Sequence, residues 1–553
     1  MRRDGGRPLA CAGALLLAAA LVAGCGDAEG PAPQAVSRDD SAPPAHGDAI
    51  VFGTLGDAST LVPMLASDSA SHEYAGNLFD GLVEYDKTLS RLEPRLAERW
   101  EVAKAGQEIT FHLRRDVRWT DGEPFTARDV QFGFDLIRDP STLTAYAEDY
   151  RQVQSFELLD DYTFRVSYEK PFAPALASWG SMVVLPRHLL AGKDINQSDF
   201  GQHPVGLGPH KFESWERNTR FTLRANAGYY RGAPWIERVV YRVIPDEATQ
   251  FLELKSGGLD MMGLTPLQYT RQTDTPVFAR DFRKYRYVSN AYTYLGYNLS
   301  DPRFADVRVR RAFGMAINKQ EIVDAVLFGL GRTSEGPYRP GTAWVNERLR
   351  PMPYDPAAAR ALLAEAGWRD TDGDGIVEKD GRPFAFQILT NQGNEQRLKT
   401  ATMIQKRLRD VGVDASVRVL EWSAFLHDFI DKRRFDAIVL GWSLSLDPDQ
   451  YDIWHSSKTG YKQFNFVGYH NAEADELLEK GRRTFDDAER KRIYDRLQEV
   501  LYEDQPYTFL YVPESTPILA SRFRGIEAAP AGISWNFPFW YVPKGEQKYM
   551  VTP

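Results

Sequence analysis

Cysteine is almost absent from this chain of 553 residues, and its two copies, Cys11 and Cys25, both lie within the first 25 positions. The remainder of the chain therefore has neither a disulfide nor a thiolate metal site. Histidine is also scarce: nine residues are scattered singly, and His72-Glu73 has no second histidine four positions later. This spacing excludes the helical zinc motif in which two histidines bind one ion.

An excess of positive charge is missing as well. The formal net charge is -9, which argues against nucleic acid as a partner, because binding a polyanion requires a basic surface. With 43% hydrophobic and 26% charged residues the composition is that of an ordinary globular protein. The length exceeds what one hydrophobic core supports, so we expect about two or three domains.

Motifs of the common enzyme classes are missing too. The chain contains no GxSxG elbow, no P-loop and no dinucleotide-binding fingerprint. A hydrolase stays open as an alternative, because a catalytic triad assembles in space rather than in sequence. We expect a protein that is not an enzyme.

The N-terminus has the layout of an export signal. Arg2, Arg3 and Arg7 precede a mostly apolar run, Leu9 to Val22, which is too short to be a good membrane span. The run closes with Val22-Ala23-Gly24-Cys25, which resembles the lipobox of bacterial lipoproteins. That resemblance implies a signal peptide at 1–24 and a lipid on Cys25; the alternative is a plain secretory signal with a chance cysteine. Residues 25–47, rich in Ala, Pro, Asp and Ser, are predicted to form a flexible tether.

The first part of the folded body is predicted to be rich in strands. Ile109, Phe111 and Leu113 alternate with polar residues, as in a half-buried strand. The runs 153–156 and 162–168 flank Asp160-Asp161 and predict a hairpin, and a helix is expected over 127–137. Further on we expect strands at 221–223 and 239–244 and a helix over 247–254.

The pattern changes after Tyr292. Apolar residues from Val309 to Leu327 recur at helical spacing, and Gly329 stands where a helix would end. Strands and helices then alternate, which predicts a parallel sheet covered by helices. The expected strands are 384–389, 413–420 and 435–440, and the expected helices are 355–367, 395–410, 423–431, 475–481 and 488–503.

One strand end stands out as a binding site. The apolar run from Ala437 to Leu440 predicts a buried strand, and it stops in a loop of hydroxyls, carboxylates and aromatic rings. Such loops at strand ends are where α/β proteins usually bind ligands. The candidate ligand-binding residues here are Trp442, Ser443, Ser445, Asp447, Asp449 and Trp454. The alternative is a surface loop with two packed tryptophans.

A second loop has the spacing of a calcium site. Asp370, Asp372 and Asp374 place carboxylates at positions one, three and five of such a loop. Gly381 occupies position twelve, where a glutamate normally binds the ion, although Glu378 or Asp380 could substitute. We favour a tight acidic turn, with calcium as the alternative and no other cofactor expected.

Aromatic residues gather near the C-terminus, at 535–541. Rings of this kind can form a wall of a binding cleft. The interpretation that we favour is a C-terminal strand that locks the domain together.

Several segments, taken in order, form a joint pattern: Asn77–Leu82, Ile109–Gly122, Phe125–Val130, Gly206–Pro209, Asn226–Gly232, Asp306–Ala312, Gly367–Asp380 and Gly441–Ser457. The pattern resembles that of the bacterial extracellular solute-binding proteins of family 5, the peptide and nickel receptors of ABC importers. The resemblance covers essentially all of the chain after the signal peptide.

The resemblance implies an α/β protein with the two-lobed periplasmic-binding-protein fold, an extra domain and a hinge between the lobes. Lobe I would comprise 48–82, 206–290 and 516–553, the extra domain 83–205, and lobe II 291–515. Ligand would be enclosed as the lobes close, and an ABC permease in the membrane would distinguish the closed form from the open one. The protein would act as an exported monomer anchored at the periplasmic or extracytoplasmic face of the envelope.

The resemblance also implies where ligand lies. In peptide-binding relatives an extended peptide adds like a strand beside a segment that matches Ser67-Asp68-Ser69, and tryptophans matching Trp422 and Trp442 shape side-chain pockets. Relatives carry an aspartate for the peptide's amino group at a point where this chain has Leu444, Ser445 and Leu446. Asp447 or Asp449 could take over that charge; the alternative is a ligand without a free amine. The expected ligand is a di- or oligopeptide; the alternatives are an oligosaccharide, a metal chelate, or ligand sensing without transport.

Overall fold

The computed structural model describes residues 42–550. The predicted signal peptide, Cys25 and most of the predicted tether lie outside these residues. The last positions of that tether contact the body: the ring of His46 lies 4.4 Å from that of Trp235, and Tyr541 donates a hydrogen bond to the carbonyl of Ala42. No helix in the described part of the chain is long and apolar enough to cross a membrane.

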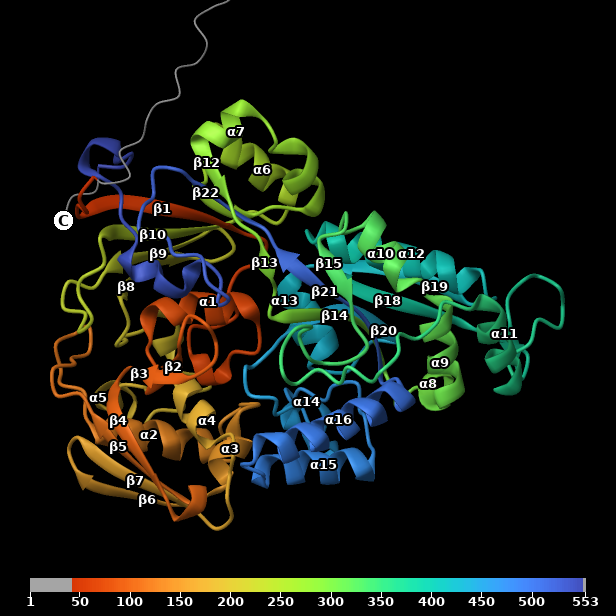
Figure 1. Ribbon diagram of the computed structural model, residues 1–553, viewed down its shortest axis with the longest axis horizontal. Helices are drawn as coiled ribbons and strands as arrows, with labels where there is room; N and C mark the ends of the chain where they lie inside the picture. Colours follow the sequence, from red (N-terminus) through yellow and green to blue (C-terminus); the bar gives the residue numbers. More distant parts are fainter. Residues whose placement is uncertain (1–41, 551–553) are drawn as a thin grey trace, which may run out of the picture. The chain divides into compact units, whose positions relative to one another are not determined.

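The first of two seven-stranded sheets gathers strands from both ends of the described chain (Figure 1). Its order is β12-β22-β11-β1-β10-β9-β8. The central strand β1 pairs in parallel with β10 and β11, and the other pairs are antiparallel. The strands are β1 (Gly47–Thr54), β8 (His210–Glu216), β9 (Arg220–Ala225), β10 (Ile236–Val243), β11 (Met261–Gly263), β12 (Phe282–Lys284) and β22 (Pro517–Ala520).

Three helices pack against this sheet or beside one another here. α1 (Ser69–Leu78) buries Tyr74 against the sheet, where its ring stacks on that of Phe221 with centroids 4.5 Å apart. α6 (Glu247–Ser256) confirms the helix predicted over 247–254, and α7 (Pro276–Asp281) packs beside it. Strands β9 and β10 confirm the two strand predictions in this region.

The second sheet has the order β13-β21-β14-β20-β18-β19, with β15 paired to β21. The predicted parallel arrangement is confirmed for β18, β19 and β20. The sheet as a whole is mixed, because β14 and β21 enter it antiparallel to their neighbours. The strands are β13 (Tyr287–Val288), β14 (Ala291–Tyr297), β15 (Gly331–Thr333), β18 (Ala385–Asn391), β19 (Asp414–Leu420), β20 (Ala437–Ser443) and β21 (Tyr507–Ser515).

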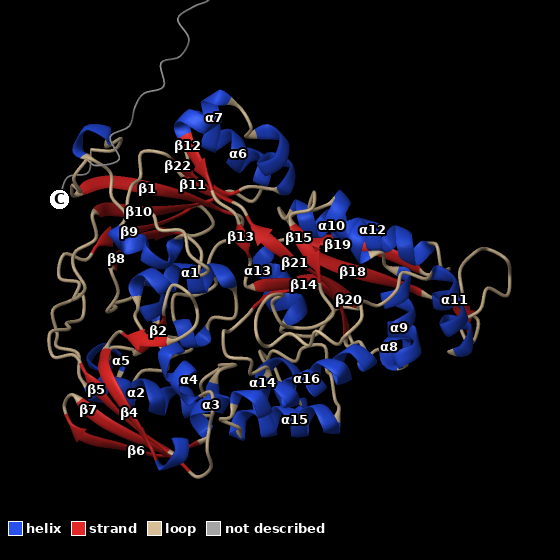
Figure 2. Cartoon of the chain, in the orientation of Figure 1, coloured by secondary structure: helices blue, strands red, loops and turns tan. Residues whose placement is uncertain are grey.

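A separate four-stranded antiparallel sheet, β4-β5-β7-β6, lies at one end of the molecule (Figure 2). Its strands are β4 (Ala97–Ala103), β5 (Glu108–Leu113), β6 (Val153–Asp160) and β7 (Thr163–Tyr168), which confirms the predicted hairpin. α2 (Ala127–Arg138) confirms the helix predicted over 127–137 and begins with a capping box between Thr126 and Asp129. Phe111, Phe164 and Trp179 form the aromatic centre of its core.

The described chain passes between the two large sheets twice, and the two crossings run side by side. Tyr285, after β12, donates its backbone N–H to the carbonyl of Pro517, the first residue of β22, at 2.9 Å. Tyr287 of β13 pairs with Ser515 of β21. Two adjacent connections confine a backbone rotation to a few residues, which is the geometry of a hinge. The domain limits given above stay a prediction.

Several helix predictions need correction. The helix expected from Val309 toward Gly329 is broken into α9 (Val307–Ala316) and α10 (Lys319–Ala325), because the side chain of Asn318 caps the second helix at the backbone N–H of Glu321. The helix expected over 423–431 is instead α13 (Trp422–Ala424) followed by a π-helical segment, Phe425–Ile430. α11 (Pro356–Glu365), α12 (Glu395–Arg409), α15 (Ala472–Arg483) and α16 (Asp487–Asp504) confirm the others with shifted ends.

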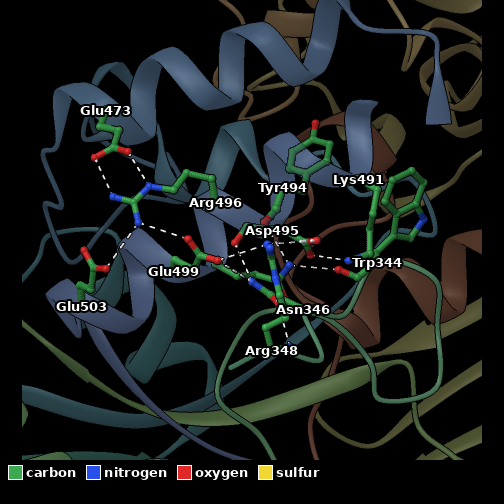
Figure 3. Close-up of polar contacts among 11 residues, drawn as sticks. Trp344, Asn346, Arg348, Glu473, Lys491, Tyr494, Asp495, Arg496, Glu499 and Glu503 are labelled. Carbon is green, nitrogen blue, oxygen red and sulfur yellow. Dashed lines mark hydrogen bonds and ion pairs between the residues drawn. The ribbon is translucent and has the colours of Figure 1, made fainter. Parts of the chain in front are cut away.

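Ion pairs fix α16 against its surroundings. Figure 3 shows Arg496 between Glu473 of α15 and the acidic side chains of Glu499 and Glu503 on its own helix. On the other side, Asn346 donates to the carbonyl of Asp495 at 3.1 Å. These contacts hold α15, α16 and the loop after β15 together, and α16 is the helix that reaches the ligand-binding loop described below.

The C-terminal aromatic segment forms neither a strand nor a cleft wall. Ser534–Phe539 is a short 3-10 helix, in which Asn536 accepts a hydrogen bond from the indole of the buried Trp540. Both interpretations of this cluster are therefore wrong. Its rings pack into the core of the first sheet, which contains Phe537, Trp540 and Val542.

Candidate ligand-binding site

A cavity of about 1310 Å³ is lined by residues from both large sheets and from the region of the four-stranded sheet. Pockets for ordinary small molecules are about 300–1000 Å³. Of the ten predicted ligand-binding residues, nine line this cavity: Ser67, Asp68, Ser69, Trp422, Trp442, Ser443, Ser445, Asp447 and Asp449. The structure places these nine residues around one cavity. That they bind ligand stays a proposal.

Trp454 is the exception. Its side chain is fully buried and packs against Tyr507, with ring centroids 4.6 Å apart, rather than lining the cavity. It is the last residue of α14 (Tyr451–Trp454), and the helix turns it into the core while Tyr451 lines the cavity. The prediction for Trp454 is wrong because one helical turn, invisible in the loop composition, decides which ring points inward.

The segment Ser67-Asp68-Ser69 is a helix cap rather than a strand edge. Asp68 is 3% exposed and accepts hydrogen bonds from the backbone N–H of Ser71 at 2.9 Å and from the hydroxyl of Ser59 at 2.6 Å. Its carboxylate therefore begins α1 and is occupied by its own protein. Ser67 and Ser69 are exposed and remain available to a ligand.

The two tryptophans lie in aromatic surroundings. The ring of Trp442 stacks on Phe466, with centroids 5.6 Å apart, and meets Phe464 edge-on at 5.3 Å. Its indole donates to the hydroxyl of Tyr507 at 3.3 Å. Trp422 lies so close to Gly56, just after β1, that a Cβ there would come within 3.0 Å of the indole. Glycine at position 56 therefore permits this contact between the two sides of the cavity.

The edge of β20 is open at the cavity. β18 pairs with β20 at Ala437 and Ile438, and the hydroxyl of Thr390 donates to the carbonyl of Val439, so no strand in the described chain pairs with that edge from Leu440 to Ser443. Gly441, Trp442 and Ser443 line the cavity. A strand edge without a partner presents backbone N–H and C=O groups that an extended chain can bind.

Asp447 and Asp449 already have cationic partners. Asp447 accepts from both terminal nitrogens of Arg490 on α16, at 2.7 and 2.9 Å. Asp449 accepts from Nε and Nη2 of Arg482 on α15, at 2.8 and 2.6 Å. Neither aspartate carries a free charge for a ligand. Sequence patterns could not predict these pairs, because the arginines lie 43 and 33 residues further along the chain.

Arg482 also links the loop to the region of the four-stranded sheet. Its Nη2 lies 2.7 Å from Asp149, and its carbonyl accepts from the backbone N–H of Ala173 at 2.7 Å. Burial raises the pKa of Asp149 to about 6, with Arg482 opposing that rise. A second ionic contact joins the same two regions: Lys458 lies 3.4 Å from Glu148 and 3.0 Å from Asp452.

Arg397, in the first turn of α12, was not predicted. It lines the cavity and donates to the side-chain oxygen of Asn391 at 2.8 Å, and no carboxylate pairs with it among the described residues. Burial lowers its pKa. A side chain at Gly441 would lie 3.1 Å from its Nη2, so glycine leaves the guanidinium accessible. The strand-end rule that identified the loop after β20 applies equally to Asn391, the last residue of β18, and would have identified this region.

The acidic loop forms a turn of its own. Ligand oxygens of Asp370, Asp372 and Asp374 lie within 4.8 Å of one another, and all three residues are exposed. They accept backbone hydrogen bonds within the loop, for example from Gly373 at 2.7 Å and Ile376 at 2.7 Å. These contacts explain the acidic spacing, and calcium binding stays a prediction.

Comparisons with known proteins agree with this architecture. Residues 91–464 match the family described as bacterial extracellular solute-binding proteins, family 5. The chain is 31% identical to the oligopeptide-binding protein AppA of Bacillus subtilis (strain 168), over 92% of this chain and 94% of that one. The structure of AppA in complex with a nonapeptide covers 91% of this chain and all of its own at a TM-score of 0.86 and 30% identity.

Two further solved structures are also similar. The periplasmic binding protein DppA of Helicobacter pylori, in complex with the peptide STSA, has a TM-score of 0.81 at 27% identity and covers 90% of this chain and 99% of its own. NikZ of Campylobacter jejuni, in complex with Ni(L-His), has a TM-score of 0.81 at 27% identity and covers 89% and 99%. The fold is thus that of two-lobed periplasmic binding proteins.

Proposed function

The chain belongs to the bacterial extracellular solute-binding proteins of family 5, and on that premise we propose that it captures a di- or oligopeptide for an ABC importer. Members of this family bind solutes and are not enzymes. The cavity would enclose the peptide between the two lobes, and the closed protein would deliver it to the membrane permease.

The observation that carries the proposal is the open edge of β20 beside a cavity of about 1310 Å³. An extended peptide can add to that edge as a strand, since its own backbone supplies the complementary N–H and C=O groups. Trp442 and Phe464 offer ring faces to apolar side chains of the peptide. The volume suits a ligand larger than an ordinary small molecule.

Arg397 offers a positive charge to an anionic group of the ligand. A guanidinium without a carboxylate partner is a strong donor to an anionic group, because charged hydrogen bonds are about twice as strong as neutral ones. We assign to Arg397 the terminal carboxylate, or an acidic side chain, of the bound peptide. This leaves the amino group of the peptide without an assigned partner, because Arg490 and Arg482 already pair with Asp447 and Asp449.

A metal chelate is the second candidate, because the similar NikZ structure contains Ni(L-His). His72 is the single histidine that lines the cavity here, and its Nε2 is 3.0 Å from the hydroxyl of Tyr146. One histidine is too few to hold a bare transition metal, so any metal would arrive with its own ligands. An oligosaccharide or a sensing role without transport would use the same cavity.

We further propose that the protein is exported as a monomer and held at the envelope by a lipid on Cys25. The export signal and lipobox support this proposal from the sequence. The predicted tether would give the binding lobes freedom to reach the permease.

Peptide capture is tested by calorimetric titration with peptides of two to nine residues, alongside mass spectrometry of any small molecule that co-purifies. We expect saturable binding of at least one peptide length with one site per chain. Binding of histidine-chelated nickel or an oligosaccharide, with no response to any peptide, would overturn the proposal.

A further inference from the structure

One carboxylate in the cavity lacks a partner. Eleven acidic side chains line the cavity. Six of them pair with arginines, one with a lysine and one with a histidine. Asp68 accepts from serines, and Glu247 accepts from the backbone N–H of Glu395 at 3.3 Å. Glu73 is the remaining one: no ion pair or side-chain hydrogen bond joins its carboxylate to another described residue.

The position of Glu73 on α1 is fixed by helix geometry. Ser69, His72, Glu73 and Gly76 are the exposed residues of this helix, and all four line the cavity. Their spacing of three, four and seven positions places them on one face. The opposite face is anchored, because Tyr74 and Leu78 are fully buried in the core of the first sheet. Glu73 is therefore presented to the cavity by a rigid helix with a capped N-terminus.

The electrostatics leave this carboxylate unsatisfied. Burial raises the pKa of Glu73 to about 7, although the side chain is reached by water in the cavity. The pKa values of Tyr74 and Tyr241 are raised chiefly by their own burial; the charge of Glu73 raises that of Tyr241 further, and the charges of Asp57 and Glu73 raise that of Tyr74. His72 and Asp68, on the same helical turn, pair with Tyr146 and with serines instead. A partly buried carboxylate without a partner is costly, and a cationic ligand group removes that cost.

The two sides of the cavity carry opposite unpaired charges. Glu73 extends from the first-sheet side, and Arg397 from the second-sheet side. The loop aspartates that could have supplied the negative charge are neutralised by Arg490 and Arg482. A ligand with separated positive and negative groups fits this arrangement.

We propose that Glu73 is the specificity-determining counter-ion for a cationic group of the bound peptide. The shared chemistry is an ammonium or guanidinium, from either the free N-terminus or a basic side chain. This inference rests on the proposed function and names the charge class of its ligand. It also accounts for a loop that carries no free aspartate next to Trp442.

The test is a calorimetric comparison of the parent with Glu73→Gln, using as probes the best-binding peptide, its N-acetylated form and a form whose basic side chain is replaced by an uncharged one. We expect Glu73→Gln to weaken binding of the cationic peptide about 10- to 100-fold. The charge-removed probe should bind both proteins within about threefold. If N-acetylation abolishes the difference in affinity between the two proteins, the cationic group is the N-terminus of the peptide. If replacement of the basic side chain abolishes it, the cationic group is that side chain.

Glu98→Gln is the matched control, because Glu98 is an exposed glutamate of β4 that does not line the cavity. It should retain the parent's preference for the cationic probe. Glu73→Gln should unfold at the parent's temperature or above it, since the substitution removes a carboxylate whose ionised form is disfavoured in the folded protein. A parent that binds peptide regardless of its charge, or a preference for the cationic probe that is kept in Glu73→Gln, overturns the role of Glu73 while peptide capture stands. If the parent binds no peptide, both proposals fall.

Discussion

Arg482→Gln is the most informative single perturbation of this protein. The guanidinium is 6% exposed and lies between Asp449, on its own lobe, and Asp149, near the four-stranded sheet. Burial by itself would lower the pKa of Arg482, but the charges of Asp449 and Asp149 raise it well above its ordinary value. Removal of the cation leaves two buried carboxylates facing each other, with Asp452 close by.

The cost divides into two parts. The bond to Asp449 persists whether or not the lobes are closed, so its loss lowers the stability of the ligand-free protein. The bond to Asp149, at 2.7 Å, joins two parts of the molecule and exists only while they are together. A hydrogen bond between charged groups is worth about 1.5–3 kcal/mol, and removal of one member of a buried pair costs about 3–5 kcal/mol in total. Loss of the bond to Asp149 makes closure less favourable by about 1.5–3 kcal/mol, which corresponds to a peptide affinity about 10- to 150-fold weaker.

The assay combines urea unfolding, calorimetric titration with the best peptide, and solution scattering with and without it. Arg483→Gln is the control: the neighbouring arginine is 49% exposed and pairs with Glu479 on the same helix. Such exposed helical pairs contribute about 0.2–0.5 kcal/mol, so the control should bind like the parent. If Arg482→Gln binds peptide as tightly as Arg483→Gln and shows the same compaction on binding, this account of closure is refuted.

Four further predictions follow from single sites. Trp442→Ala should weaken peptide binding about tenfold or more, because it removes a ring from the cavity wall. Trp535→Ala is the control: Trp535 does not line the cavity, so the affinity measured by calorimetry should stay unchanged. Asp447→Asn should lower the free energy of unfolding by about 1.5–3 kcal/mol, since it leaves Arg490, which is 7% exposed, without its anionic partner; an unchanged urea midpoint would contradict this pairing. The pKa of Glu73, raised by burial to about 7 from 4.5, makes its ionised form unfavourable in the folded protein, and that penalty is absent below 4.5 and complete above 7. The Tm of Glu73→Gln should therefore exceed that of the parent by an amount that grows as pH rises from 4.5 to 7 and then levels off. A difference in Tm that shrinks over this range would contradict a raised pKa of Glu73. Cys25→Ser should abolish incorporation of labelled fatty acid and release the protein from membranes in cell fractionation, with Cys11→Ser as the control.

The sequence was enough to locate the strands and helices whose hydrophobic patterns are strong. The alternation from Phe384 to Leu440 predicted three parallel strands, because buried strands and amphipathic helices have different periods within a few residues. It also directed attention to the end of β20, and Trp442 near that end lines the cavity. What it could not predict was the mixed order of the second sheet, since β14 and β21 come from 291–297 and 507–515 and join it through long-range pairing.

The charges of the site were decided by tertiary structure alone. In the sequence Asp447 and Asp449 have every sign of a ligand-binding pair, and only the packing of α15 and α16 brings Arg482 and Arg490 against them. Glu73 shows the converse, because nothing in its local sequence distinguishes it from the other acidic residues that line the cavity. A carboxylate is available to a ligand only if no cation of the protein reaches it first, and that depends on distances between segments far apart in the chain. Local patterns therefore determined the elements of this protein, and the meeting of distant side chains determined which of its charges are free.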